Sequence, residues 1–246
     1  MNEKVIYEVL RIIDGKPLFL EEHMKRMENS FNLIDEKFTL KHDEIKKRIN
    51  RLVKEECKLC GNIKITYSIN EKKLDVFFIK HSYPSEEMYK CGVKVILYFG
   101  ERENPNAKII NDDFRNKVND KIKENGAYEA ILIDRNGFIT EGSRSNIFMI
   151  KDDTILTSPI KAVLPGVTRK KVIEAAKELG LYVKEQEYNY ERIQELDAMF
   201  ISGTSPKILP ISYVNNIKLN EKNTTILKLM DVYDNNINEY LASYIK

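Results

Sequence analysis

Apolar and polar positions along the first third of the chain follow the spacings of short strands and amphipathic helices. The predicted elements are, in order, a strand at 5–13, a hairpin turn at 14–17, a returning strand at 18–20, helices at 21–33 and 41–55, and a hairpin with strands at 63–69 and 74–79. Met24, Met27 and Phe31 fall on one face of the first helix, as a surface that faces a core requires. This order of elements predicts an antiparallel α+β unit.

The polar segment His81-Ser82-Tyr83-Pro84-Ser85 breaks this pattern and is the best candidate linker. Beyond it, the pattern predicts strands at 93–98, 128–134, 138–140, 146–150, 154–157, near Val183 and at 198–202, helices at 112–125 and 169–179, a short helix near Arg192, and a last helix from Thr225. We find no internal repeat and no low-complexity segment. The sequence therefore predicts an α+β protein with two domains, residues 1–83 and residues 84–246.

The composition is that of a folded protein with a large core and a balanced surface charge. The 246 residues are 42% apolar, and 40 lysines and arginines oppose 38 aspartates and glutamates. The basic residues are scattered, which argues against nucleic acid as the main partner. No run approaches the roughly 20 apolar residues that span a bilayer, and the start, MNEKVIYEVL, lacks the layout of a signal peptide. We therefore expect a soluble, cytoplasmic protein with no membrane partner.

Residue types that bind metals are few and dispersed. Cys57 and Cys60 have the CxxC spacing of zinc or redox sites, but no second CxxC and no nearby pair of histidines completes such a site. Cys91 stands apart, so the three cysteines do not make a disulfide framework. We expect reduced cysteines and no metal ion.

The segment 139–146, ITEGSRSN, places a carboxylate, Glu141, between two apolar runs. The runs at 130–133 and 147–150 are typical of core strands. A carboxylate buried between them is costly unless another group is its partner. The segment therefore raises the question of what Glu141 meets.

Lys108 lies in an irregular stretch, residues 106–111, flanked by small and apolar residues. A lysine held in apolar surroundings has a lowered pKa, which makes its amine nucleophilic. The alternative is an ordinary surface lysine, which is the role of most lysines in this chain.

Two turns and one arginine have the features of an anion site. Residues 165–169, PGVTR, lead into a helix, whose first N–H groups, dipole and threonine hydroxyl suit a phosphate. Residues 202–206, SGTSP, offer further N–H and hydroxyl donors, and Arg26 could supply a guanidinium. Each feature also has an ordinary interpretation: Thr168 as a helix N-cap, 202–206 as a strand-ending turn, and Arg26 as a solvated charge.

Taken together, these motifs resemble the fold-type IV pyridoxal-phosphate enzymes, which include branched-chain aminotransferases, D-amino-acid transaminases and aminodeoxychorismate lyase. The resemblance covers nearly the whole chain from Val5 onward, and its motifs keep the family's order and spacing. The matching segments are EHMKRM at 22–27, YEAIL at 128–132, ITEGSRSNIF at 139–148, LPGVTR at 164–169, DAMF at 197–200 and SGTS at 202–205.

The resemblance implies a small N-terminal α/β domain, a larger C-terminal β-barrel-like domain with helices, and the cofactor pyridoxal 5′-phosphate. Lys108 is then the lysine that forms a Schiff base with the cofactor and moves the proton during catalysis. Glu141 is implied to pair with the pyridine nitrogen and keep it protonated, so that the ring withdraws electrons. The residues implied to hold the phosphate are Arg26, Val167, Thr168 and Thr204.

The substrate pocket is the part that the resemblance defines least. Tyr7 matches an aromatic position of the pocket wall, or is a core residue of its strand. Lys64 falls near an arginine of the branched-chain enzymes, or is a solvated edge-strand lysine, and the substrate carboxylate could instead bind N–H groups at Thr204 and Ser205. The family usually begins with an extra hairpin before the strand matching 5–8. We therefore expect either a short form or a pocket built differently on that side.

The motifs LPGVTR and SGTS look more like those of the aminotransferases than those of the lyase. We therefore expect transamination between an amino acid and a 2-oxo acid, with a branched-chain L-amino acid favoured and a D-amino acid as the other option. One alternative is the lyase reaction, which converts 4-amino-4-deoxychorismate to 4-aminobenzoate and pyruvate. Another is a homologue that binds the cofactor without turnover. The resemblance also implies a homodimer.

Overall fold

The computed structural model describes residues 4–102 and 105–244. Contacts between Cα atoms divide the chain into two compact units: unit 1 is Met1–Ser82, Ala107–Ile110 and Asn235–Lys246, and unit 2 is Tyr83–Asn106 and Asn111–Asp234. The predicted division, 1–83 and 84–246, stays a prediction. The compact units differ from it in that Tyr83 belongs to unit 2 and residues 107–110 and 235–246 belong to unit 1.

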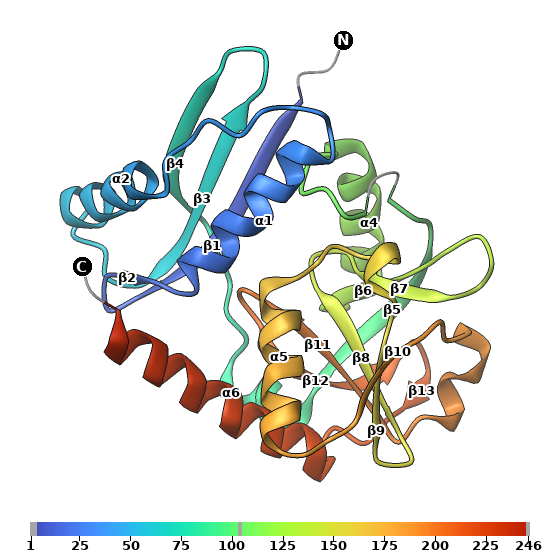
Figure 1. Cartoon of the computed structure of the whole chain (residues 1–246). Helices are drawn as coiled ribbons and strands as arrows, with labels where there is room; N and C mark the ends of the chain where they lie inside the picture. The colour runs from blue at the N-terminus through green and yellow to red at the C-terminus, as the bar shows by residue number, and fades with distance from the viewer. Residues whose placement is uncertain (1–3, 103–104, 245–246) are drawn as a thin grey trace. The chain divides into compact units, whose positions relative to one another are not determined.

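Unit 1 is an antiparallel sheet with two helices on one face, as Figure 1 shows. Its strands, in sheet order, are β2 (Lys16–Pro17), β1 (Val5–Ile13), β3 (Gly61–Ser68) and β4 (Lys73–Ile79), and its helices are α1 (Leu20–Asn32) and α2 (His42–Glu55). The three residues predicted on one face of α1, namely Met24, Met27 and Phe31, are all buried in the core between helices and sheet. That prediction is confirmed.

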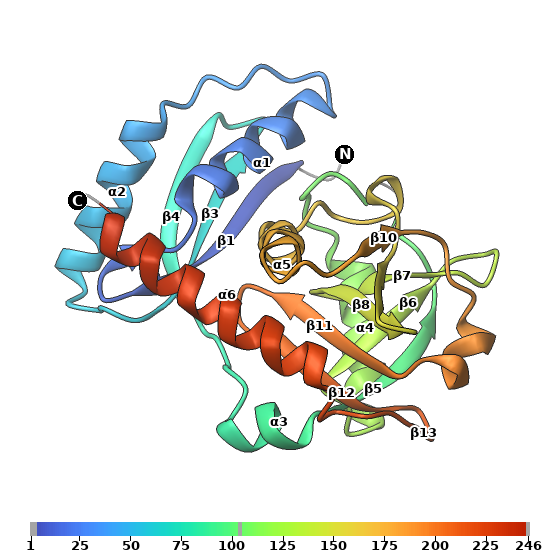
Figure 2. The ribbon, with the colours of Figure 1, turned by 60° about the horizontal axis from the view of Figure 1, so that its bottom comes forward.

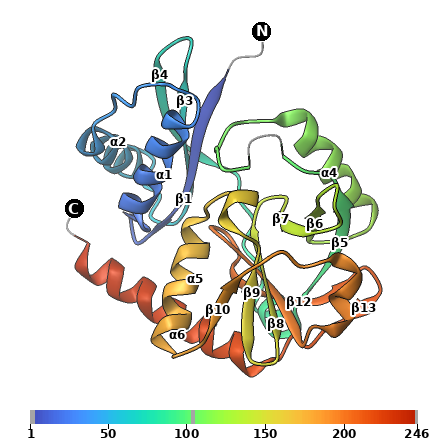
Figure 3. The ribbon, with the colours of Figure 1, turned by 45° about the vertical axis from the view of Figure 1, so that its right-hand side comes forward.

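The main body of unit 2 is a closed β-barrel, visible in Figure 3. Its ring consists of β8 (Asn146–Lys151), β11 (Ala198–Gly203), β12 (Lys207–Val214), β5 (Val93–Phe99), β6 (Glu129–Ile133) and β7 (Ile139–Gly142), and it closes because β7 also pairs with β8. Strands β9 (Thr154–Thr157) and β10 (Val183–Glu185) extend the sheet from β8, and β13 (Ile217–Lys218) pairs with β12. The α+β class and the barrel-like second domain are confirmed.

Successive side chains along the barrel strands point alternately to the inner and the outer face of the barrel. One apolar core takes a residue from every strand of the ring, for example Ile147 and Met149 of β8 and Ile201 of β11. The side chains between them, such as Phe148 and Phe200, point to the other face, where their rings stack at 4.9 Å. That outer face carries helices α4 (Asp112–Glu124) and α5 (Val167–Glu178).

The remaining helices are α3 (Glu86–Cys91), α6 (Thr224–Ser243) and the 3₁₀ turns η1 (Ile160–Ala162) and η2 (Tyr190–Glu195). Figure 2 shows α6 as one continuous helix, whose first half belongs to unit 2 and whose second half belongs to unit 1. Among the residues that the structure describes, no helix has both the length and the apolar content to cross a bilayer.

Four elements of unit 2 have no counterpart in the prediction: α3, η1, β12 and β13. Strand β12 contains Pro210 opposite Phe200, and a proline inside an apolar run argues against a strand because it cannot donate to the ladder. Helix α3 buries none of its residues, so it lacks the apolar periodicity that marks a helix in a sequence.

Candidate active site

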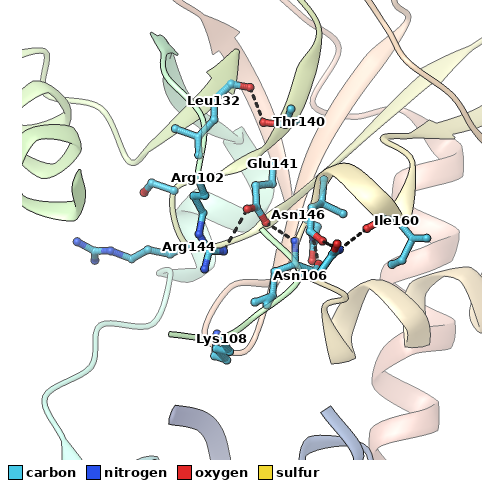
Figure 4. Close-up of polar contacts among 12 residues, drawn as sticks. Arg102, Asn106, Lys108, Leu132, Thr140, Glu141, Arg144, Asn146 and Ile160 are labelled. Carbon is cyan, nitrogen blue, oxygen red and sulfur yellow. Dashed lines mark hydrogen bonds and ion pairs between the residues drawn. The ribbon is translucent and has the colours of Figure 1, made fainter. Parts of the chain in front are cut away.

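Glu141 lies on β7, and its buried carboxylate, 4% exposed, has partners on both oxygens. Arg102 Nη1 donates to Oε1 at 3.1 Å, and the backbone N–H of Leu164 donates to Oε2 at 2.9 Å. In Figure 4 the Arg102 and Glu141 side chains point toward each other. Arg102 was not singled out from the sequence, because the irregular stretch that holds it has no periodicity to place it.

A pocket of about 420 Å³ within unit 2 has Glu141 and Arg102 in its wall. Leu132, Thr140 and Ala162 also line it. The hydroxyl of Thr140 donates to the carbonyl of Leu132 at 3.1 Å, which ties β7 to β6 beside Glu141. The carboxylate is therefore buried but borders an open volume.

A second buried carboxylate, Glu129 on β6, shapes the turn that follows Glu141. Its Oε1 accepts hydrogen bonds from the backbone N–H and the hydroxyl of Ser143, at 3.1 and 2.5 Å. Its Oε2 accepts from the N–H of Arg144 at 3.2 Å and from the hydroxyl of Ser145 at 3.0 Å. These contacts explain the small hydroxyl residues of GSRS: they order the turn between β7 and β8.

A row of polar side chains crosses three neighbouring strands of the barrel. Asn146 is the register partner of Glu141 across β7 and β8, and of Ser202 across β8 and β11. Opposed residues of antiparallel strands point to the same face, so Glu141, Asn146 and Ser202 lie on one face. The Ser202 hydroxyl is buried and finds no hydrogen-bond partner among residues 4–102 and 105–244.

The loop that leads into α5 is fastened to this row. Asn146 Nδ2 donates to the carbonyl of Leu164 at 2.9 Å, and Asn106 Nδ2 donates to the carbonyls of Ile160 and Val163, each at 2.7 Å. A Cβ at Gly166 would clash with Asn146 Oδ1, so glycine is the residue that fits there. The start of α5 is thereby fixed close to the polar row.

Helix α5 begins at Val167, with Gly166 as its N-cap residue. Thr168 lies inside the first turn, so the interpretation of Thr168 as an N-cap is wrong; the close approach of Asn146 reserves the cap position for glycine. The first N–H groups of any helix lack acceptors within the helix. Val167 and Thr168, both buried, supply such groups here. The turn after β11 holds Thr204 and Ser205.

In unit 1, Lys108 lies beside β1, next to an isolated bridge between Ile109 and Ile6. Its carbonyl accepts from the N–H of Tyr7 at 3.1 Å, and its own N–H donates to the hydroxyl of Ser30 at 3.3 Å. The bridge between Ile6 and Ile109 continues the pairing. Lys108 is half-buried and its backbone is fixed on both sides, unlike that of a loose surface lysine.

Two lysines of unit 1 contact the same aromatic ring. The Nζ atoms of Lys108 and Lys64 lie 4.8 and 5.0 Å from the centroid of the Tyr7 ring, within cation–π range. Tyr7 itself is buried. The structure therefore brings together the three predicted site residues of unit 1 other than Arg26.

Arg26 is buried in an ion pair with Glu8, so its interpretation as a solvated helix charge is wrong. Arg26 Nε donates to Glu8 Oε1 at 2.8 Å and Nη2 to Oε2 at 2.5 Å, while His23 Nδ1 lies 2.8 Å from Oε2. Burial would raise the pKa of Glu8, but the charge and hydrogen bonds of Arg26, helped by His23, lower it to about 2. A sequence signal for Glu8 exists: it is a charged residue at a core-facing position of β1.

The cysteines take no part in these clusters. Cys57, Cys60 and Cys91 are exposed, free thiols. Within the parts of the chain that the structure describes, no group of three or more histidine, cysteine and acidic side chains could hold a metal ion.

Comparison with known proteins places this geometry in a family context. The family model described as amino-transferase class IV matches residues 5–214. A branched-chain-amino-acid aminotransferase of Escherichia coli (strain K12) is 39% identical over 105 residues, which are 42% of this chain and 34% of that protein. The match thus spans about a third of that relative's length. A D-alanine aminotransferase of Bacillus licheniformis is 27% identical over 237 residues, covering 85% of this chain and 78% of that protein.

Two solved structures share the fold at low sequence identity. A candidate 4-amino-4-deoxychorismate lyase from Legionella pneumophila has a TM-score of 0.85 at 21% identity, over 94% of this chain and 90% of that chain. A branched-chain amino acid aminotransferase of T.th., solved with pyridoxamine 5′-phosphate, has a TM-score of 0.83 at 22% identity, over 96% and 86%.

Proposed function

Because the chain belongs to the amino-transferase class IV family, we propose that it is a pyridoxal-phosphate enzyme that moves an amino group from an amino acid to a 2-oxo acid. The observation that carries this proposal is the position of Glu141. It is a buried carboxylate on the wall of a pocket, and the loop that starts α5 donates a hydrogen bond to it. Such a group suits a ligand with a cationic ring nitrogen.

One buried side chain of unit 2 has a polar group that a bound cofactor could satisfy. The Ser202 hydroxyl is a buried polar atom with no hydrogen-bond partner among the described residues, at the end of the strand that leads to Thr204. Such a group is costly unless a ligand or water satisfies it. When bound, pyridoxal phosphate supplies an electron-withdrawing ring that stabilises negative charge on the α-carbon of the substrate.

Each site residue then has a defined task. With the cofactor bound, Glu141 would stabilise a proton on the pyridine nitrogen, and Lys108 Nζ would attach the cofactor and carry the proton of the substrate α-carbon. The N–H groups of Val167 and Thr168 at the start of α5 would bind the phosphate. The full set assigned to the phosphate is Arg26, Val167, Thr168 and Thr204.

The proposed donor is a branched-chain L-amino acid, with a D-amino acid as the second option. The names of the two similar relatives support these two classes. Tyr7 would form an apolar wall against the donor side chain. Lys64 and the N–H of Ser205 would bind its carboxylate, and the contact of the Lys64 ammonium with the Tyr7 ring supports the role of Lys64.

A second candidate function is the lyase reaction on 4-amino-4-deoxychorismate, favoured by the fold shared with the Legionella pneumophila protein. The two reactions differ in their products. The purified enzyme would be incubated with L-leucine, L-glutamate, D-alanine or D-glutamate and a 2-oxo acid, and separately with 4-amino-4-deoxychorismate. A new amino acid supports transamination, pyruvate with 4-aminobenzoate supports the lyase, and neither product supports a binder without turnover.

We also propose that the protein forms a homodimer through the sheet of unit 1. Both helices pack on one face of this sheet, and the opposite face presents Val9, Ile79 and the 40% exposed Phe77. Strand β4, which carries Phe77 and Ile79, is also an edge of the sheet. An apolar face beside an open edge favours association with a second copy. Light scattering should give twice the chain mass of 28.8 kDa, and the monomer mass would contradict the dimer.

A further inference from the structure

The loop between β9 and α5, residues 158–166, is the part of unit 2 that presents a backbone donor to Glu141. The N–H of Leu164 donates to Glu141 Oε2 at 2.9 Å, and the loop ends at Gly166, the N-cap residue of α5. Its regular structure is one short 3₁₀ turn, η1, a type of turn whose hydrogen bonds have poor geometry. Contacts from the surrounding elements therefore decide where the N–H of Leu164 lies.

Glu185, on β10, holds the first turn of this loop. Its Oε2 accepts a hydrogen bond at 2.9 Å from the backbone N–H of Ile160, the first residue of η1. Strand β10 is parallel to β9, with Glu185 opposite Thr157, so the carboxylate extends from a strand that is paired with the last residue before the loop. Glu185 thereby ties the start of the loop to the sheet.

Arg169, in the first turn of α5, reaches the same carboxylate from the other end of the loop. Its Nη2 lies 3.2 Å from Glu185 Oε2 and donates to the carbonyl of Ser158 at 3.0 Å. Arg169 is 4% exposed, and its Nε has no hydrogen-bond partner among residues 4–102 and 105–244. Because a buried guanidinium is costly without an anion, we expect the pair to persist. The two ends of the loop are joined through it.

Ile160 links this ion pair to the part of the loop that meets Glu141. Its N–H is bound by Glu185, and its carbonyl accepts from Asn106 Nδ2 at 2.7 Å, a contact drawn in Figure 4. Only three residues separate Ile160 from Leu164. A shift of Ile160 should therefore reach the backbone of Leu164 and disturb its hydrogen bonds.

From these contacts we propose that Glu185 is a positioning residue of the cofactor site, which acts by fixing the loop that presents Leu164 to Glu141. The inference rests on the function proposed above. Glu185 acts through the loop and not on the ligand. Its effect is to order the donor to Glu141 and the entry to α5 before the cofactor arrives. Binding then proceeds without the entropic cost of ordering these groups.

The first measurement is amide hydrogen exchange of the cofactor-free protein, followed by NMR for the wild type, Glu185→Ala and Glu185→Gln. In Glu185→Ala the amide of Leu164 should exchange about tenfold faster, because its hydrogen bond to Glu141 opens more often. The amide of Ile201, in barrel strand β11, should keep its rate, whereas a general loss of stability would change both rates. Glu185→Gln keeps an oxygen that can accept from Ile160, so it should restore most of the protection.

The second measurement is the dissociation constant of pyridoxal 5′-phosphate, determined by absorbance. Glu185→Ala should weaken binding about tenfold, the lower range for the loss of a group that orients ligand-binding residues from outside. Glu187→Ala is a matched control: Glu187 is an acidic residue of the same segment, and its carboxylate lies 4.0 Å from Nζ of Lys161 on η1, with both side chains largely exposed. Such exposed pairs contribute little, so this variant should stay within about twofold of the wild type.

Glu185→Ala leaves the buried Arg169 without its anion. The double variant Glu185→Ala/Arg169→Met removes both charges, and it serves with the same expectations if Glu185→Ala does not fold. If Leu164 keeps its exchange rate in the variant, or if the variant binds the cofactor as tightly as Glu187→Ala does, the inference is wrong while the proposed function stands. If the wild-type enzyme does not bind pyridoxal 5′-phosphate, the proposed function fails and the inference fails with it.

Discussion

Glu8 in unit 1 and Glu141 in unit 2 are both buried carboxylates on strands, but they have different partners. Glu8 is 0% exposed, and it is bound by Arg26 and His23, which are buried themselves. Glu141 is 4% exposed, but its cation, Arg102, has a side chain 21% exposed and lines an open pocket with it. A partner that reaches solvent can give way to a ligand, whereas a fully buried one cannot.

This difference indicates two kinds of task for one residue type. In the cluster around Glu8, the carboxylate and both of its partners, Arg26 and His23, are buried. In the cluster around Glu141, the partner Arg102 lines a pocket, so a cationic ligand bound in that pocket would lie near the negative charge of Glu141. The burial of the two carboxylates is nearly the same, so it does not distinguish them. The exposure of the arginine that pairs with each carboxylate does distinguish them.

The largest expected effect is the acid sensitivity caused by Glu8. Its pKa in the folded state, about 2, lies below the usual 4.5, so its stabilisation is complete above pH 4.5 and is lost as the pH falls toward 2. The loss amounts to about 3 kcal/mol of unfolding free energy. The lowered pKa of His23 adds a loss in the same direction below pH 6.5. Urea unfolding at pH 6, 4 and 3 measures this, and a flat profile would contradict the account.

Glu141→Gln should have the next largest effect, on turnover rather than on stability. The amide keeps the shape but cannot hold a proton on the pyridine nitrogen, so amino transfer should slow roughly a hundredfold. The cofactor should still attach through Lys108. Single-turnover kinetics with a responding amino acid measures the change, and an unaltered rate would remove Glu141 from the chemistry.

Arg102→Met tests whether the partner of Glu141 is replaceable by a ligand. Without cofactor, the variant should lose about 2 kcal/mol of unfolding free energy, because the buried carboxylate loses its cation. With pyridoxal phosphate bound, the loss should be smaller, since the ring nitrogen takes over that role. Thermal unfolding of the wild type and the variant, each with and without the cofactor, measures the two losses of stability. Equal losses with and without the cofactor would mean that the cofactor does not reach Glu141.

Ser202→Ala should have the smallest effect. It should not destabilise the cofactor-free protein, but it should weaken binding of the cofactor. Removing a buried hydroxyl that has no partner among the described residues should leave the stability of the cofactor-free protein unchanged or raise it by up to about 1 kcal/mol. The same change should weaken cofactor binding modestly. Destabilisation of the cofactor-free form would show that the hydroxyl is already satisfied there.

Much of the fold could be predicted because apolar spacing encodes it. Strand β1 and helix α1 follow their expected spans within a residue or two. Their regularly spaced apolar residues lie in one core. Strand β12 was not predicted, although Leu209 and Ile211 lie in the barrel core and the strand pairs with β11 and β5 on either side. Pro210 in its middle even argues against a strand in sequence.

The candidate site was predictable only in part. The motif around Glu141 stands out because a charge interrupts two core strands, yet its partner Arg102 is distant in sequence and has no local pattern. Thr168 as an N-cap was the ordinary alternative to a phosphate role, and the structure has Gly166 as the N-cap residue, close to Asn146. Such long-range contacts decide a site without leaving a periodic signal in the chain.

The proposed function is tested most directly by the visible absorption spectrum with pyridoxal phosphate. The band of the lysine-bound cofactor should form, and one of L-leucine, L-glutamate, D-alanine or D-glutamate should convert it to that of the pyridoxamine form. Lys108→Ala should abolish the band, whereas Lys184→Ala, which changes an exposed lysine on β10, should not. A band that persists in Lys108→Ala, or one that no amino acid converts, would contradict the account of this protein as an aminotransferase.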